Sequence, residues 1–193
     1  MDFVDQYLTE LEGVIRNISR PRVGEAIDLL FRAWQDQRTV FLIGNGGSAA
    51  TASHMMNDLN KYTVVPGRRR FRAMALTDNV PLLTAIGNDA EYADIFVEPL
   101  RNLLCPGDVL IAISASGNSP NIVKAVEYAR QKGATVIGFC GHPGGNLARL
   151  ADLAVTIPSD RIGQQEDGHM ILDHVISAAL RERIVQAVSG TGA

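Results

Sequence analysis

The sequence predicts an α/β fold in which a parallel β-sheet is covered by helices on both faces. The chain alternates between short apolar runs and longer segments with helical spacing of apolar residues. The short runs are apolar throughout, which is typical of strands buried on both faces of a parallel sheet. Ligands of such sheets bind beyond the carboxyl ends of the strands, so we expect functional residues in the loops there.

The elements follow in order along the chain. Two helices come first, because apolar residues recur at helical spacing from Val4 to Ile15 and Pro21 introduces the next segment. The predicted strands are residues 39–43, 73–76, 108–113, 135–139 and 153–157. The predicted helices are residues 4–19, 22–35, 49–62, 80–86, 95–103, 119–132, 146–151 and 166–188. We expect the helices of residues 1–35 to mediate oligomerisation. Residues 36–193 are expected to form the ligand-binding domain, which ends in a long C-terminal helix.

Size, charge and cysteine content exclude several classes of function. A chain of 193 residues suits one domain with a proper core. A formal net charge of −3 gives no support for a nucleic-acid partner, and the basic cluster at residues 68–72 reads as a solvated loop. Cys105 and Cys140 give no disulfide framework, which favours a reducing, cytoplasmic location. Neither a signal peptide nor a run of membrane-spanning length is recognisable, so we expect no membrane partner.

A glycine-rich turn, Gly-Asn-Gly-Gly-Ser at residues 44–48, follows the first predicted strand and opens a helix. Glycines let backbone amides approach an anion, and a helix N-terminus offers unpaired N–H donors and a positive dipole end. His54 and Asp58 follow at i and i+4, on one helix face. The segment therefore combines an anion cradle with a metal or acid–base pair, and phosphosugar chemistry needs both.

A second phosphate signal, Ser-Ala-Ser-Gly-Asn-Ser-Pro at residues 114–120, follows the third predicted strand. Three hydroxyls and several N–H groups can surround a phosphate there, while Pro120 suits the first turn of a helix. The alternative is a helix N-cap with spare serines. The first loop is weak evidence alone, since it matches neither the dinucleotide fingerprint nor a Walker A sequence. The pair of loops is much more specific.

These two loops, together with His54 and the pair Asn88-Asp89, resemble the sugar isomerase (SIS) domain. More narrowly, they resemble the sedoheptulose 7-phosphate isomerases, also called phosphoheptose isomerases, from about Tyr7 to about Val188. The resemblance implies a five-stranded parallel sheet in a flavodoxin-like three-layer sandwich. It also implies a homotetramer with active sites between subunits, and a place in bacterial synthesis of heptose precursors for lipopolysaccharide or related glycans. We expect the N- and C-terminal helices to form the oligomer bundle, because they carry more apolar surface than one small sheet needs.

The resemblance also implies a role for each matched position. Those implied to bind substrate are Asn45, Gly46, Gly47, Ser48, Asn88, Asp89, Ser114, Ala115, Ser116, Ser119 and Glu166. Asp58 and His174 are implied as the catalytic acid and base. The implied metal ligands are His54, Asp58, Glu166 and His174, which would hold one Zn²⁺ per site.

The match loosens at the fourth ligand, where the best-known members have a glutamine eight residues before the C-terminal histidine. On an ideal helix, Gln165 faces about 180° away from His174, Glu166 about 80° and Asp167 about 20°. We favour Glu166 and keep Gln165 and Asp167 open. Asp58 is one methylene shorter than the glutamate of those members, so either the metal shifts or a water fills the gap. We interpret the substitution as the mark of a subfamily with another sugar preference.

The predicted reaction is an aldose–ketose isomerisation of sedoheptulose 7-phosphate. It needs a base poised near neutral pH, an acid for the carbonyl oxygen and stabilisation of an enediol. Two alternatives stay open: a non-catalytic SIS protein similar to the factor that binds the bacterial replication initiator, and a SIS isomerase or etherase for another sugar phosphate. The convergent ligands argue against a scaffold alone. Of the remaining histidines, His169 is expected at the surface or an interface and His142 in a loop.

Overall fold

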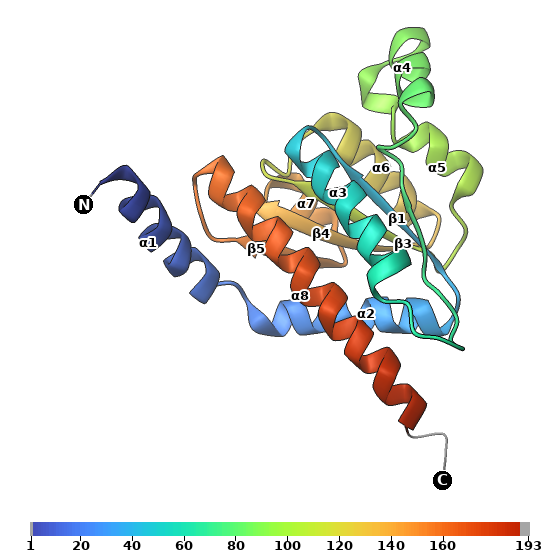
Figure 1. Ribbon diagram of the computed structural model, residues 1–193. Coiled ribbons are helices and arrows are strands. Elements are labelled where there is room, and N and C mark those ends of the chain that lie inside the picture. Colours follow the sequence, from blue (N-terminus) through green and yellow to red (C-terminus); the bar gives the residue numbers. More distant parts are fainter. Residues whose placement is uncertain (1, 190–193) are drawn as a thin grey trace.

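The computed structural model describes residues 2–189 and contains a five-stranded parallel sheet between two layers of helices (Figure 1). The strands are β1 (Thr39–Gly44), β2 (Arg72–Ala75), β3 (Val109–Ser114), β4 (Thr135–Gly141) and β5 (Leu153–Ile157). Their order in the sheet is β2-β1-β3-β4-β5, and each neighbouring pair is parallel. The strand order changes direction between β1 and β3, which is where ligands of such sheets bind.

The helices cover both faces of this sheet. They are α1 (Phe3–Arg16), α2 (Arg20–Gln35), α3 (Gly47–Asn57), α4 (Val80–Asp89), α5 (Val97–Leu103), α6 (Pro120–Gln131), α7 (Gly145–Leu150) and α8 (Ile162–Ser189). A 3₁₀ turn spans Tyr92–Asp94, and a π-helical turn spans Asp58–Tyr62. Within residues 2–189, no helix combines the length with the apolar character that a membrane span requires.

β1 shows why the strands are apolar throughout. Val40 and Leu42 belong to the core that α2, α3 and α8 cover, whereas Phe41 and Ile43 belong to the core under α5, α6 and α7. All four side chains are buried, because successive residues of a strand point to opposite faces. The two cores explain why no polar alternation marks these strands in the sequence.

Several element boundaries differ from the prediction, and three of these differences bear on the site. α8 begins at Ile162, four residues before the expected start at Glu166. The sequence did not predict these four residues as helical because they lack apolar periodicity and include a glycine. The expected helix at residues 49–62 ends as α3 at Asn57 and continues as the π-helical turn, whose first residue is Asp58. α4 extends three residues beyond the expected end and includes Asn88 and Asp89.

The π-helical turn is tied to the edge of the sheet by one side chain. The Asn60 amide nitrogen donates to the Ala73 carbonyl at 2.8 Å, and the Ala73 N–H donates to the Asn60 carbonyl oxygen at 3.1 Å. Ala73 lies in β2, whose single neighbour in the sheet is β1. Asn60 therefore satisfies the backbone of β2 on the side that no strand covers.

The two N-terminal helices differ in how much they bury. α2 contributes six buried residues to the core under the sheet, whereas Val14 is the one buried residue of α1. α1 projects from the body of the protein (Figure 1) and exposes Phe3, Val4 and Leu8. α8 likewise exposes Val175 and Val185. These surfaces match what the predicted oligomer bundle needs, and the bundle itself stays a prediction.

Candidate functional site

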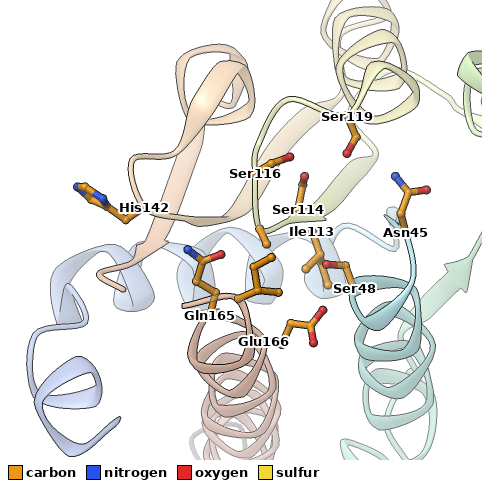
Figure 2. Close-up of a pocket in the computed structure, with 11 residues that line it drawn as sticks. Asn45, Ser48, Ile113, Ser114, Ser116, Ser119, His142, Gln165 and Glu166 are labelled. Carbon is orange, nitrogen blue, oxygen red and sulfur yellow. The ribbon is translucent and has the colours of Figure 1, made fainter. Parts of the chain in front are cut away.

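A cavity of about 360 Å³ lies beyond the carboxyl ends of β1 and β3. Its lining residues are Asn45, Ser48, Ile113, Ser114, Ala115, Ser116, Ser119, His142, Ile162, Gln165 and Glu166. Figure 2 shows the serine side chains of the two loops around one space, with Glu166 reaching it from α8. We call this cavity the serine pocket. It brings together seven residues predicted to bind substrate, while Gly46 and Gly47 lie in the adjoining turn.

The glycine turn lets α8 approach the start of α3. α3 begins at Gly47, and a Cβ atom at that position would overlap the carboxylate of Glu166. A negative charge at a helix N-terminus is favourable because of the unpaired N–H groups and the helix dipole. The Glu166 carboxylate thus lies at the N-terminal end of α3, and the serine loop is the better place for a bound anion.

The serine loop is shaped by its own backbone contacts. Gly117 has φ +64° and no room for a Cβ beside the Gly144 carbonyl, so glycine is required there. The Ser114 hydroxyl accepts from the Gly117 N–H at 3.1 Å, and that of Ser116 accepts from the Asn118 N–H at 3.2 Å. Ser119, in contrast, makes no side-chain capping bond at the start of α6. Two of these serines thus shape the loop and the third does not cap α6, so the alternative of a simple helix N-cap does not describe this loop.

Asn45 is held in place by residues that the sequence did not single out. Its side-chain amide forms a reciprocal pair with that of Asn121, at 2.9 and 2.8 Å, and accepts from the Tyr92 hydroxyl at 3.2 Å. Asn121 is buried in the first turn of α6. The pair links the glycine turn to the serine loop. The sequence could have indicated a role for Asn121, because it is a polar residue directly after Pro120. No feature of the sequence indicated a role for Tyr92.

His142 and Gln165 line the serine pocket from the loop after β4 and from the first turn of α8. His142 lies in a loop, as expected, with its Nδ1 atom 3.0 Å from an Asp160 carboxylate oxygen. The Gln165 amide donates to the Ser159 carbonyl at 2.6 Å. Among residues 2–189, no lysine or arginine lines the pocket. Within one chain, N–H and hydroxyl groups are therefore the main donors to a phosphate.

Asn88 and Asp89 do not reach the serine pocket of their own chain. They are the last two residues of α4, both exposed, and the Asn88 amide donates to the Asp89 carboxylate at 2.9 Å. α4 stands off the body of the protein (Figure 1) and contains no buried residue. Asp89 lines a different hollow, between α4 and α5.

A second group of polar residues lies where α3 and the turn after it pack against α8 (Figure 1). We call His54, Asp58, Asp173 and His174 the histidine–carboxylate cluster, because their ligand atoms all lie within 4.8 Å of one another. The Nε2 atoms of His54 and His174 are 3.2 Å apart. From the His54 Nε2 atom, a carboxylate oxygen of Asp58 lies at 3.8 Å and one of Asp173 at 3.9 Å.

The cluster has an open side and a buried floor. The His54 side chain is 44% exposed, and that of Asp173 is 0% exposed. One Asp173 oxygen accepts from the Ser177 hydroxyl at 3.1 Å, while Oδ2 has no hydrogen-bond partner in the described part of the chain. Burial raises the pKa of Asp173 to about 6, and the nearby Asp58 carboxylate adds to the rise. Burying the Asp173 carboxyl group here therefore costs the folded protein free energy.

The cluster fits a metal ion. Four ligands about 2.1 Å from a tetrahedral zinc stand about 3.4 Å from one another, which is close to the separations found here. Two imidazoles and two carboxylates are donors that zinc accepts. Glu166, predicted as the fourth ligand, lies outside the cluster. It precedes His174 by eight residues, or about 12 Å along an ideal helix, and lines the serine pocket instead.

The predicted catalytic pair lies in the cluster and faces its own hollow. Asp58 and His174 line a surface cavity with Tyr62 and Ala178, separate from the serine pocket. One chain therefore presents the phosphate signals and the predicted acid–base pair in two different cavities.

His169 occupies the core, so the expectation of a surface or interface position was wrong. It is 0% exposed and its ring stacks on that of Phe139, with centroids 6.5 Å apart. Burial lowers the pKa of His169 to about 4, and a weak interaction with the Cys140 backbone opposes part of this shift. The apolar face of α8, which decides the position of His169, could not be placed from spacing alone.

Comparison with known proteins agrees with this architecture. The SIS domain matches residues 2–141. The phosphoheptose isomerase of Geotalea daltonii is 35% identical over 175 residues, covering 90% of each chain. That of Rhodospirillum rubrum is 38% identical over 165 residues, covering 85% of this chain and 87% of its own.

Solved structures give the same result. Phosphoheptose isomerase GmhA from Neisseria gonorrhoeae superposes with a TM-score of 0.86 at 29% identity, covering 93% of this chain and 97% of its own. A phosphoheptose isomerase from Francisella tularensis gives a TM-score of 0.85 at 27% identity, covering 94% and 100%. The chain therefore belongs to the SIS domain family and, within it, to the phosphoheptose isomerases.

Proposed function

We propose that the protein converts sedoheptulose 7-phosphate to D-glycero-D-manno-heptose 7-phosphate by proton transfer through an enediol. The observation that carries this proposal is the serine pocket, in which two phosphate-type loops meet a carboxylate from α8. The names of the relatives supply the substrate class. The two free thiols fit a cytoplasmic location.

In this proposal, the serine loop holds the phosphate. The hydroxyls of Ser114, Ser116 and Ser119 and the N-terminal end of α6 provide donors without a cationic side chain. The remaining substrate contacts are assigned to Asn45, Gly46, Gly47, Ser48, Ala115, Glu166, Asn88 and Asp89. Glu166 suits a sugar hydroxyl, because a carboxylate accepts hydrogen bonds.

Asp58 and His174 are assigned as the acid–base pair. A proton must leave one carbon and reach its neighbour, while a second proton moves between their oxygens. Zn²⁺ in the cluster would polarise the substrate carbonyl. His174 is exposed and can exchange a proton with substrate and solvent, while the half-buried Asp58, in the π-helical turn after α3, is the second group of the pair.

We further propose that the working site lies between subunits of a homotetramer. Three observations support assembly: the separate cavities of the phosphate loop and the acid–base pair, the outward position of Asn88 and Asp89, and the exposed apolar residues of α1 and α8. Packing α1 and α8 into a bundle between chains would bury those residues and bring cavities of different chains together.

Turnover of several sugar phosphates, measured with and without a chelator, tests the function. We expect isomerisation of sedoheptulose 7-phosphate, with loss of rate after metal removal and recovery on adding zinc. Turnover of a different phosphosugar alone would move the protein to another SIS enzyme class. No turnover of any substrate by the metal-loaded oligomer would favour the non-catalytic regulator.

A further inference from the structure

We propose that Asp173 is the fourth ligand of the ion held by His54, Asp58 and His174, in the place expected for a residue at 165–167. This inference rests on the metal site of the proposed function and names a ligand that the family pattern does not supply. It stands on burial, on the contacts of the competing residues and on charge.

Asp173 carries a buried carboxylate oxygen that has no hydrogen-bond partner among residues 2–189. The side chain is 0% exposed, and Ser177 satisfies only Oδ1. Oδ2 lies among the cluster atoms without a hydrogen-bond partner in the described residues. A buried carboxylate is expensive unless it is paired, hydrogen-bonded or bound to a metal. An ion between the two histidines would supply the missing partner.

The three residues that spacing suggested are all engaged elsewhere. Gln165 donates to the Ser159 carbonyl, and Glu166 lies against Gly47 at the start of α3. Asp167 accepts from the Tyr7 hydroxyl of α1 at 2.6 Å. Moving any of them to the cluster would break its present contact and require a rearrangement of α8. Asp173 needs none, since its ligand atom already lies within 4.8 Å of those of His54, Asp58 and His174.

The positions and charges of the four groups agree with a divalent ion. Asp58 and Asp173 approach the His54 Nε2 atom at nearly equal distances, 3.8 and 3.9 Å, from two different segments. Asp58 and Asp173 already supply the two carboxylates that, with two neutral imidazoles, balance the charge of Zn²⁺, so the ion needs no further carboxylate from Glu166 or Asp167. A second aspartate therefore compensates both for the absent glutamine and for the short side chain of Asp58. Glu166 is then left to the serine pocket.

Zinc affinity of matched variants tests this ligand set. Competition with a chromophoric chelator, using the intact oligomer, measures zinc binding by wild type, Asp173→Asn and Glu166→Gln. We expect Asp173→Asn to weaken zinc binding at least about a hundredfold, the upper range reported for loss of an outer-shell partner alone. Glu166→Gln should bind zinc within about twofold of wild type. Unchanged affinity in Asp173→Asn, or a large loss in Glu166→Gln alone, would overturn the proposal.

A measurement on the wild-type protein keeps the proposal testable if Asp173→Asn fails to fold. Anomalous scattering at the zinc edge, from crystals of the zinc-loaded oligomer, locates the ion. We expect it within bonding distance of the Asp173 Oδ2 atom and away from Glu166 of every chain. An ion bound by Glu166 instead, or no ion at the cluster, would refute the assignment.

The same experiments separate this ligand set from the proposed reaction. Zinc bound by Asp173 in a protein without isomerase activity would leave the ligand set standing and remove the function. Isomerase activity in a protein whose zinc is not bound by Asp173 would support the function and refute the ligand set.

Discussion

The serine pocket and the histidine–carboxylate cluster are built in opposite ways. The pocket is made mostly by two short loops at neighbouring strand ends, where backbone geometry places the donors. The cluster joins side chains 120 residues apart in the sequence, on α3 and α8, where helix packing places them. A loop motif therefore carries its own geometry, whereas a site between helices depends on the whole core.

α8 connects the two regions. Glu166, in its second turn, reaches the serine pocket, and Asp173 and His174 reach the cluster two turns later. A change confined to one region should alter one kinetic constant, whereas a change in the support of α8 should alter both.

The largest expected effect is that of His174→Ala. It removes an acid–base group and a ligand from an exposed position, so kcat should fall about a thousandfold or more while the state of association stays that of wild type. Steady-state kinetics and light scattering measure the two properties. Near-normal turnover by this variant would exclude the cluster from catalysis and favour the scaffold function.

The next effect falls on the pocket. Ser116→Ala combined with Ser119→Ala removes two hydroxyls from the phosphate loop, so KM should rise at least about a hundredfold with little change in kcat. Ser19→Ala is the matched control, because Ser19 precedes α2 and makes no capping bond with its side chain. An unchanged KM in the double variant would remove this loop from the substrate site.

A smaller effect concerns the support of α8, through His169. Its pKa is lowered from 6.5 to about 4, so the unfolded chain takes up a proton below pH 6.5 while the native core resists it. This residue should cost about 3 kcal/mol of stability as pH falls from 7 to 4.

The comparison of wild type with His169→Leu isolates this contribution. The raised pKa of Asp173 acts with the opposite sign below pH 6 in the metal-free protein, but it is common to both chains. Urea unfolding at several pH values should therefore show His169→Leu gaining stability relative to wild type on acidification. Parallel pH profiles would contradict burial of a neutral His169.

The smallest effect is expected for Asp58→Glu, which keeps a carboxylate on the same helix face. Its kcat should stay within about tenfold of wild type, whereas Asp58→Ala should lose activity as severely as His174→Ala. Kinetics of the two variants with equal zinc content make the comparison. Equal losses in both would show that the length of this side chain, and not its charge alone, is critical.

Much of this architecture could be predicted from the sequence. Apolar runs located the strands, and the two loops located the pocket, because both are local signals. The buried positions of His169 and Asp173 could not be predicted, since they depend on which face α8 turns toward the sheet and α3. The early start of α8 made the fourth ligand harder to predict as well. Gln165, Glu166 and Asp167 already lie within this helix and have other contacts.

The pairing of Asn60 with Ala73 has a consequence for how copies of the chain can meet. An edge strand with free N–H and C=O groups invites another strand to join, which leads to open-ended growth of a sheet. Here a side-chain amide occupies the backbone of β2 at Ala73, and the π-helical turn stands beside it. The contact thereby opposes strand addition at the β2 edge, which favours closed association through helices on this side of the molecule.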